Sequence, residues 1–323
     1  MATIDLNPVA SVLQTYSQWT VVGHNIPDGD CIGAVIGLQN TLKQMGKDIT
    51  SVIEEGVPSM YQFLDGWEHI STFQNPGLIH KNIIYVDCSD RQRVGEKLTT
   101  LLESAEFVVN IDHHVSNQKF GNINLVDEYA SSTCELLFNL IKLLNISIGH
   151  EIATPLYCGI VMDSGRFQYS ATRPETLETA AELLRSGVNL DLVRGRLFES
   201  KSKLEMTVTS AALETLSFSE DNRLAWMWLS NSVLSKLGAI GKHFEGIIDF
   251  ARNVEGVEVA VLFREIEPGK IKIGIRSKGT IDANQAAALW GGGGHRRAAG
   301  AMLTGEIKDV IEQVTGRFKD ELL

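Results

Sequence analysis

Acidic and imidazole side chains occur in three short groups in the first half of this 323-residue chain. The first group is His24, Asp28 and Asp30, the second is Asp87 alone, and the third is the run Asp112–His114. Carboxylates together with imidazoles suit Mn, Fe, Zn or Co ions, whereas Ca²⁺ prefers a shell made only of oxygen. If the three groups meet in the fold, the expected chemistry is therefore the binding of divalent metal ions.

A further acidic residue, Asp163, ends an apolar stretch and could join the same site from the side. The four candidate carboxylates Asp28, Asp30, Asp87 and Asp163 would carry a charge of about −4, which two divalent ions would neutralise. Two ions roughly 3.5 to 4 Å apart can hold a hydroxide between them and flank a phosphoryl group for in-line displacement. The donor set therefore favours hydrolysis of a phosphate ester.

Each group by itself has an ordinary structural explanation. A single histidine such as His24 is more often packed in a core or on the surface than bound to a metal ion. One aspartate after a strand often caps the next helix, as Asp30 could do, and Asp87 alone is weak evidence for the same reason. Metal binding is favoured because all the groups, together with the rarer Asp-His-His, follow strand-like segments.

The elements that would position these groups alternate between strand and helix patterns. Alternation of this kind predicts a mostly parallel sheet with helices on both faces. Ligands bind where the carboxyl ends of such strands meet, so the three groups should converge there. Gly46 is expected to end the first long helix, and Thr172 to cap the helix that begins at Pro174. The expected strands lie at 20–23, 49–53, 83–86 and 107–111, and the expected helices at 32–45, 132–144, 152–162 and 174–184.

The second half of the chain has a different pattern, with a hairpin turn at 267–270, four consecutive glycines at Gly291–Gly294 and then His295. We expect an α/β protein of two domains, the second smaller and built on a mixed sheet, with a cleft between them. The expected boundaries are 1–187 for the metal-binding domain, 188–220 for a helical connector and 221–323 for the second domain. Its expected strands lie at 224–229, 257–264 and 271–276, and its expected helices at 283–290 and 307–322.

The balance of charge restricts the class of partner. The chain has 29 Lys and Arg against 40 Asp and Glu, a formal net charge of −11, which argues against clamping of long duplex DNA. The segment 264–297, however, contains seven basic and three acidic residues. Such a basic patch can attract an anionic substrate. Glycines let backbone N–H groups approach a phosphate. The alternative, a flexible turn, is less favoured because His295 and the stretch Arg276–Lys278 accompany the glycines.

The four cysteines form no CxxC pair, which favours reduced thiols in a cytoplasmic protein over a disulfide framework. The apolar runs are far shorter than the ~20 residues that cross a bilayer, and no secretory signal is visible. We therefore expect a cytoplasmic protein without membrane contact.

Four segments resemble, in order, the four motifs of the DHH phosphoesterases: His24–Gly33, Val86–Asp87, Asp112–His114 and Asp163–Phe167. The glycine-histidine segment, with Ala298–Gly300, resembles the DHH-associated C-terminal domain. The resemblance spans nearly the whole chain. It is greatest to the NrnA-type oligoribonucleases, which degrade very short RNAs and many of which remove the 3′-phosphate of 3′-phosphoadenosine 5′-phosphate. The segments that indicate this branch lie at 112–117, 120–125 and 172–177.

The resemblance implies a role for each matching residue. One metal ion would be held by His24, Asp28 and Asp87. The second would be held by Asp30, Asp87, His113 and Asp163, with Asp87 bridging the two. Asp112 and His114 are the implied catalytic pair. Asp112 would lie behind the metal ligands or add to the metal site, and His114 would contact the scissile phosphate or protonate the leaving oxygen. The residues implied to bind substrate are Arg276, Ser277, Asn284, Gly293, Gly294 and His295.

Two residues depart from the family pattern. Cys31 stands where members often have Ala, and Ala34 where they often have Ser. The resemblance implies Mn²⁺ as the metal, with Mg²⁺ or Co²⁺ as alternatives, and short single-stranded RNA or nucleotides as substrates. The same motifs leave open a phosphodiesterase of cyclic or linear dinucleotides. An inorganic pyrophosphatase, a RecJ-type exonuclease and a nucleotide-binding regulator without turnover are less favoured. The oligomeric state is open, a homodimer being one option.

Overall fold

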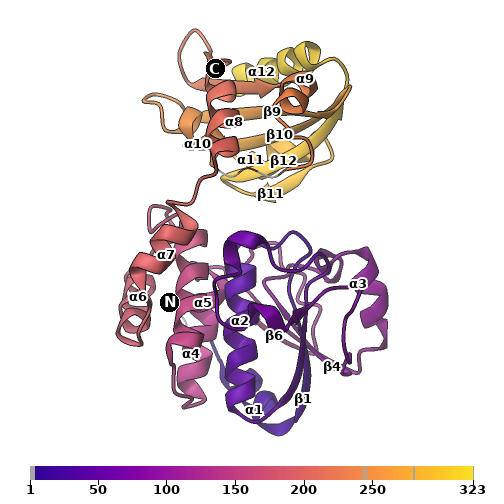
Figure 1. Ribbon diagram of the computed structural model, residues 1–323, viewed down its shortest axis with the longest axis vertical. Coiled ribbons are helices and arrows are strands. Elements are labelled where there is room, and N and C mark those ends of the chain that lie inside the picture. The colour runs from indigo at the N-terminus through magenta and orange to yellow at the C-terminus, as the bar shows by residue number, and fades with distance from the viewer. Residues whose placement is uncertain (1–3, 243, 245, 279–280, 323) are drawn as a thin grey trace. The chain divides into compact units, whose positions relative to one another are not determined.

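The computed structural model describes residues 4–242, 244, 246–278 and 281–322. The chain divides into two compact units, Met1–Ser200 and Lys201–Leu323, each with its own sheet (Figure 1). The segment expected as a connector is divided between them, because α7 (Leu190–Leu197) lies in the first unit and α8 (Lys203–Leu213) in the second. No helix within the described ranges is both long enough and apolar enough to cross a membrane.

The first unit is built on a six-stranded sheet in which every neighbouring pair is parallel. The strand order is β3-β2-β1-β4-β5-β6. The four predicted strands are its four central members, which confirms the expected fold class. The short edge strands β3 and β6 were not predicted. The strands are β1 (Gln18–Val22), β2 (Asp48–Val52), β3 (Ile70–Ser71), β4 (Asn82–Val86), β5 (Phe107–Asp112) and β6 (Ile123–Val126).

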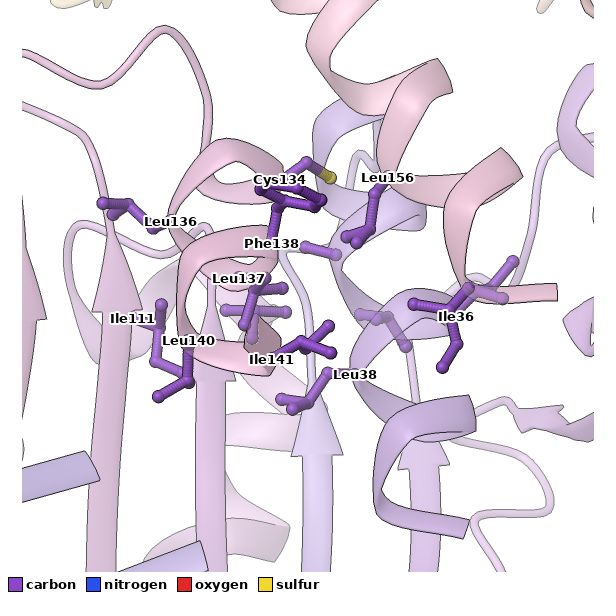
Figure 2. Close-up of a cluster of buried hydrophobic side chains, with 14 of the residues drawn as sticks. Ile36, Leu38, Ile111, Cys134, Leu136, Leu137, Phe138, Leu140, Ile141 and Leu156 are labelled. Atoms are coloured by element: carbon purple, nitrogen blue, oxygen red, sulfur yellow. The ribbon is translucent and has the colours of Figure 1, made fainter. Parts of the chain in front are cut away.

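Helices cover both faces of this sheet. On one face the side chains of α4 fill the space between the strands and α2 (Figure 2). On the other face, α3 packs its Leu98 against Val22, Ile83 and Val108 of the strands. The helices of this unit, besides α7, are α1 (Asn7–Thr15), α2 (Gly29–Gln44), α3 (Glu96–Leu101), α4 (Thr133–Leu143), α5 (His150–Asp163) and α6 (Pro174–Arg185).

Local side-chain hydrogen bonds begin these helices, and they correct two expectations. Asp28 caps α2, since its Oδ1 accepts the backbone N–H groups of Asp30 and Cys31 at 3.0 and 3.1 Å, so the expectation that Asp30 is the cap is wrong. Thr172 does not cap α6 either. Pro174 occupies the first helical position, so the cap falls at Arg173. Ser132 caps α4, and Gly46, at φ 73°, ends α2 as expected.

Helices α2 and α5 approach closely because small residues line their contact. A Cβ at Gly33 would lie only 2.4 Å from the carbonyl oxygen of Pro155. Pro155 lies inside α5 and cannot donate a hydrogen bond to the carbonyl of Glu151. The side chain of Asn40, from α2, donates to that carbonyl instead, at 2.8 Å. At the other end of the helix pair, Asp30 at the start of α2 and Asp163 at the end of α5 both lie near His113, which follows β5.

The second unit holds the expected mixed sheet, with strand order β11-β12-β10-β9-β8-β7. Strands β8 and β9 are parallel and the other neighbouring pairs are antiparallel. Part of the glycine run, expected as a turn or loop, forms the edge strand β11. The strands are β7 (Ser217–Phe218), β8 (Leu224–Leu229), β9 (Val259–Glu267), β10 (Lys270–Ser277), β11 (Gly293–His295) and β12 (Ala298–Thr304).

One face of the second sheet packs against α11 (Ala283–Ala288) and α12 (Ile307–Leu322), which are the two helices predicted here. The other face packs against α8, α9 (Asn231–Lys236) and α10 (Ile247–Arg252). Each unit therefore has a core of its own.

Candidate metal centre

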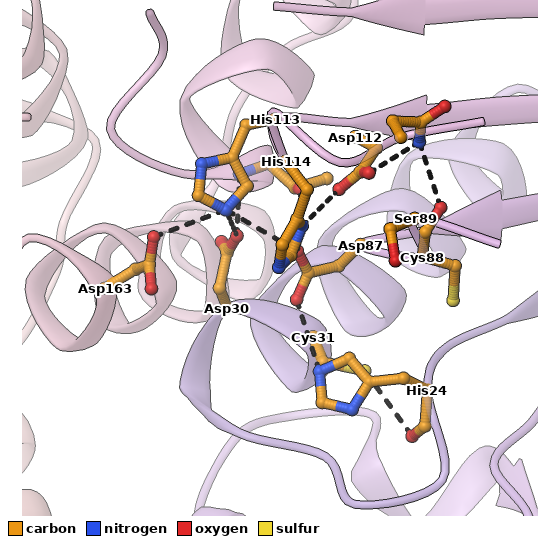
Figure 3. A network of polar contacts seen from close by, with 12 residues as sticks. His24, Asp30, Cys31, Asp87, Cys88, Ser89, Asp112, His113, His114 and Asp163 are labelled. Atoms are coloured by element: carbon orange, nitrogen blue, oxygen red, sulfur yellow. Dashed lines mark hydrogen bonds and ion pairs between the residues drawn. The ribbon is translucent and has the colours of Figure 1, made fainter. Parts of the chain in front are cut away.

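The chemical groups follow strand ends at the carboxyl edge of the first sheet. His24 follows β1, Asp87 follows β4, and Asp112–His114 end and follow β5. Asp87 has φ 58°, a left-handed conformation that Asp tolerates better than most residues. The sharp turn there directs the carboxylate back over the sheet edge. Figure 3 shows these side chains meeting one another, with His24 on one side of Asp87 and His113 on the other.

The two oxygens of Asp87 face different histidines. Its Oδ2 lies 3.4 Å from Nε2 of His24, while its Oδ1 lies 3.7 Å from Nε2 of His113 and 3.6 Å from Nδ1 of His114. Asp87 is only 2% exposed, so these imidazoles replace water around its charge. A carboxylate placed in this way has the arrangement that a bridging ligand needs.

His113 is held so that one nitrogen faces the carboxylates. Its Nδ1 lies 3.3 Å from the carbonyl oxygen of Ala130 and donates to it, which leaves Nε2 for the site. Nε2 lies 3.3 Å from Oδ2 of Asp163 and 3.8 Å from Oδ2 of Asp30. Asp163 ends α5, so the group that was expected to join from the side does so.

Asp28 and Cys31 complete the surroundings of His24. The Oδ1 of Asp28 lies 3.8 Å from His24 Nε2, and its side chain is half exposed. The buried thiol of Cys31 lies with His24 and Asp87 in a group whose ligand atoms are all within 4.8 Å of one another. The structure therefore brings together all six residues expected to bind metal: His24, Asp28, Asp30, Asp87, His113 and Asp163.

The first turn of α4 holds one of these carboxylates from behind. The backbone N–H groups of Thr133 and Cys134 donate to Oδ2 and Oδ1 of Asp30 at 2.6 and 3.0 Å. The Thr133 hydroxyl also donates to Oδ1 of Asp87 at 3.1 Å. No spacing rule indicated this role for Thr133. The only signal in the sequence is the Ser132-x-x-Glu135 pattern that places a helix start here.

A buried carboxylate fixes that turn in place. Glu135 is 2% exposed and accepts hydrogen bonds from Ser131 Oγ at 2.6 Å and from Thr176 Oγ1 at 2.8 Å. Arg173 pairs with its other oxygen at 3.0 Å. The start of α6 and the start of α4 are thus joined through one side chain. This connection supports the helix end on which Asp30 rests.

His114 has a different set of partners. Its Nδ1 lies 2.7 Å from Oδ1 of Asp112, which is fully buried. Asn117 donates to the other oxygen of Asp112 at 2.6 Å, and its amide also lies within hydrogen-bond distance of the Asn110 side chain and the Cys88 carbonyl. Asp112 therefore orients His114 rather than facing the other carboxylates.

Burial and mutual charge shift the pKa values of the centre. Burial alone would raise the pKa of Asp87, but the hydrogen bond from His24 and the charges of the histidines outweigh it and hold the pKa well below its usual range. Burial lowers the pKa of His113, yet the charges of Asp163 and Asp30 raise it overall to about 9. Burial raises the pKa of Asp163 to about 6 and that of Asp30 well above its usual range. Carboxylates this crowded hold protons when no cation balances them.

The donor set of the centre fits divalent cations. It supplies carboxylate oxygens and imidazole nitrogens, with Asp87 presenting one oxygen to each side. The ligand atoms of His24, Cys31 and Asp87 lie within 4.8 Å of one another, and so do those of Asp87, His113 and His114. The residues present therefore fit divalent cations.

Comparison with known proteins agrees with this geometry. Residues 18–160 match the model of the DHH family, N-terminal domain, and residues 229–320 match the DHHA1 domain. The bifunctional oligoribonuclease and PAP phosphatase NrnA of Thermus thermophilus is 34% identical over 303 residues, which are 94% of this chain and 89% of that protein. The chain belongs to the DHH family.

Two further similarities extend the comparison. The cyclic-di-AMP phosphodiesterase PdeA of Listeria monocytogenes is 29% identical over 88% of this chain and 44% of its own length. A crystal structure of an exopolyphosphatase-related protein from Bacteroides fragilis has a TM-score of 0.92 and 24% identity, covering 100% of this chain and 99% of that one. This likeness shows that the two proteins share their fold along the whole chain.

In the DHHA1 region, the residues expected to bind substrate gather at one end of the sheet. Ser277 ends β10 and is buried, with its hydroxyl 3.3 Å from the Arg296 carbonyl. Oδ1 of Asn284 accepts the backbone N–H of Gly294 at 2.9 Å, so that N–H is already used within the protein. Gly293 pairs with Gly300 in the sheet. The glycine segment is therefore held in place rather than being a loose turn.

Arg276 and His295 complete the expected set. The Arg276 side chain lies at the same end of β10, with Nη1 3.2 Å from the carbonyl of Ile275. His295 belongs to β11, but its side chain lies outside the part of the chain that the structure describes. Its role as a substrate contact in this DHHA1 domain stays a prediction.

Proposed function

We propose that this chain is a metal-dependent phosphoesterase that hydrolyses short oligoribonucleotides to mononucleotides, and 3′-phosphoadenosine 5′-phosphate to AMP. The observation that carries the proposal is the meeting of acidic and imidazole groups from three strand ends and α5 around Asp87. Its substrate class is supported by the similarity to the NrnA oligoribonuclease and PAP phosphatase over most of both chains. Release of mononucleotides makes it an exoribonuclease in type.

The ligand assignment is supported by the histidines near each oxygen of Asp87 and by the carboxylates near those histidines. We assign His24 and Asp28, with Asp87, to one cation, and Asp30, His113 and Asp163, with Asp87, to the other. Mn²⁺ suits mixed carboxylate and imidazole donors, with Mg²⁺ or Co²⁺ as alternatives. When bound, such a pair lowers the pKa of a bound water and neutralises charge on the phosphoryl oxygens.

The protein's own contribution to bond breaking is assigned to His114. Its Nδ1 is held by Asp112, so Nε2 is the nitrogen that would meet the phosphate and give a proton to the leaving oxygen. Burial alone would lower the pKa of His114, but the hydrogen bond to Asp112 and the nearby carboxylate charges raise it overall. A protonated His114 is the form that a general acid requires.

The DHHA1 region is assigned to substrate binding. Arg276 is the charged side chain at the end of β10 where the glycine segment is anchored, and it suits a phosphate. Ser277 and Asn284 are assigned to holding that end in shape, since both bond to its backbone. Gly293, Gly294 and His295 would form the surface that the nucleotide contacts. We also propose a cytoplasmic location, which the four free, buried cysteines support.

The direct test is an assay of purified protein with Mn²⁺ on a 5′-phosphorylated RNA dinucleotide. Release of mononucleotides is expected, and none is expected from Asp87→Asn. Asn tolerates the left-handed backbone at this position and removes the bridging charge. If the wild-type protein binds Mn²⁺, is folded and releases nothing, the proposed function is wrong.

A second function is favoured by the similarity to the Listeria cyclic-di-AMP phosphodiesterase. Such an enzyme would use the same metal centre on a cyclic or linear dinucleotide. Parallel rates on dinucleotide RNA, 3′-phosphoadenosine 5′-phosphate, cyclic di-AMP and pyrophosphate separate the two. A kcat/KM highest on cyclic di-AMP would replace the leading proposal with this one.

A further inference from the structure

Thr133 contacts two candidate ligands that come from different parts of the chain. Its backbone N–H donates to Asp30 Oδ2 at 2.6 Å, and its hydroxyl donates to Asp87 Oδ1 at 3.1 Å. Asp30 lies at the start of α2 and Asp87 after β4, so Thr133 joins them through a third element, α4. Thr133 is fully buried, which keeps water from competing for these bonds.

The hydroxyl bond falls on one particular oxygen of Asp87. Oδ1 is the oxygen near His113 and His114, whereas Oδ2 is the one near His24. A carboxylate can rotate about its Cβ–Cγ bond, and rotation would exchange or misplace the two oxygens. A single donor on Oδ1 fixes the plane of the carboxylate and therefore which way each oxygen points.

Other features show that this donor is itself held rigidly. Ser132 caps α4 and Glu135 ties its first turn to Ser131, Arg173 and Thr176. Cys134 adds a second backbone bond to Asp30. Thr133 therefore has little freedom to move away from Asp87 when the site is loaded.

We infer that Thr133 is a positioning residue of the metal centre, whose hydroxyl divides Asp87 between two cations by holding Oδ1 toward His113. The inference rests on the proposed function only in assuming that Asp87 bridges two cations. Loss of the hydroxyl lowers the affinity for the cation on the His113 side more than the affinity for the cation on the His24 side. Groups that orient metal ligands in this way typically contribute about 10- to 100-fold to metal affinity.

The test is calorimetric titration of metal-free protein with Mn²⁺, without substrate. Thr133→Val keeps the shape and the backbone N–H but removes the hydroxyl, and Thr133→Ser keeps the hydroxyl but removes the methyl. Asp163→Asn, which changes a ligand only on the His113 side, identifies the binding step that belongs to that side. We expect Thr133→Val to weaken that step by about 10- to 100-fold, and Thr133→Ser to bind as the wild type does.

Two results would overturn the inference: unchanged Mn²⁺ affinity in Thr133→Val, or equal weakening in Thr133→Ser. If Thr133→Val does not fold, as thermal melts would reveal, Thr133→Ser and Thr133→Ala provide the same comparison, since they differ only in the hydroxyl. Failure of the proposed function is a separate result, because it would appear as two Mn²⁺ ions bound by wild-type protein without turnover.

Discussion

His113 and His114 are adjacent in the chain, yet they serve different purposes because their Nδ1 atoms have different partners. His113 donates to a backbone carbonyl and turns Nε2 toward three carboxylates. His114 is bonded to a buried carboxylate, Asp112, which favours its charged form. The first arrangement suits a metal ligand and the second a proton donor.

Replacing Asp112 tests the second role. Asp112→Asn keeps the shape but removes the charge that holds a proton on His114. We expect kcat to fall about 10²- to 10⁴-fold with little change in KM, because only proton transfer is impaired. Steady-state kinetics against pH measure this, and the alkaline limb of the kcat profile should shift to lower pH. A variant with wild-type kcat would refute the assignment of His114 as an acid.

The pKa shifts at the centre predict how Mn²⁺ affinity depends on pH. Burial opposes charge on His113, but its neighbouring carboxylates raise the pKa to about 9, and burial raises the pKa of Asp163 to about 6. Both groups must lose their protons to bind a cation, so Mn²⁺ affinity should rise as pH increases from 6 to 9. Titrations in buffers of different ionisation enthalpy should detect released protons. Affinity independent of pH with no proton release would contradict this prediction.

At the residue scale, the sequence supplied the chemical groups but not their supports. The six candidate ligands could be named because acids and imidazoles follow strand-like segments, and parallel strands bring such ends together. Thr133 could not be assigned in this way, since it contacts residues 103 and 46 positions away through the packing of α4. Asn117 contacts Asp112 only five positions away, but from a segment with no helix or strand pattern. A hydroxyl or amide has no pattern that marks its partner.

At the scale of elements, the closeness of α2 and α5 decides whether Asp30 and Asp163 can share a histidine. Both carboxylates lie near Nε2 of His113, at 3.8 and 3.3 Å. Gly33 and Gly159 lie in the contact between the helices, and a Cβ at Gly159 would lie 2.9 Å from Asp30 Oδ1. The small residues therefore serve the site as well as the packing.

Adding one methyl group at this contact tests that view. Gly33→Ala would place a Cβ 2.4 Å from a backbone oxygen, so we expect a loss of about 1 to 3 kcal/mol in the free energy of unfolding, and weaker Mn²⁺ binding. Gly195→Ala in α7 is the matched control, because nothing lies within 4 Å of its Cβ position. There, Ala should stabilise the protein by about 0.5 to 1 kcal/mol. Urea unfolding measures both, and similar values for the two variants would refute the packing argument.

Long elements with clear periodicity were predictable, and short ones were not. The helix 307–322 and the strand 224–229 match the structure because their apolar positions repeat over the whole element. Strand β3 has two residues, and β11 consists of two glycines and a histidine, so neither has an apolar pattern to detect. Such strands form because a neighbouring edge offers hydrogen bonds, which is a property of the sheet and not of the segment.

At the scale of the whole molecule, the candidate metal ligands all belong to the first unit. Mn²⁺ stabilises the state that binds it, so we expect it to slow hydrogen exchange in β4, β5 and the first turn of α4. Amides of the described residues after 200 should exchange at unchanged rates. Hydrogen–deuterium exchange with and without Mn²⁺ measures both regions. Protection confined to the second unit would place the metal elsewhere.

The change in pattern near residue 220 predicted two domains, and the expected helical connector is divided between the two units of the structure. Its helices belong to different units because each buries apolar residues in its own neighbour's core, Val193 in the first and Val208 in the second. A helix-prone segment alone does not tell which core it will join. The cleft expected between the domains stays a prediction.

The distribution of sulfur gives this molecule a built-in reporter. All four thiols, at positions 31, 88, 134 and 158, are buried in the first unit, and the chain has none after residue 158. Burial raises the pKa of each, so they remain protonated and slow to react while that unit is closed. A thiol-specific dye added under native conditions would therefore time the opening of one half of the chain, with no background signal from the other half.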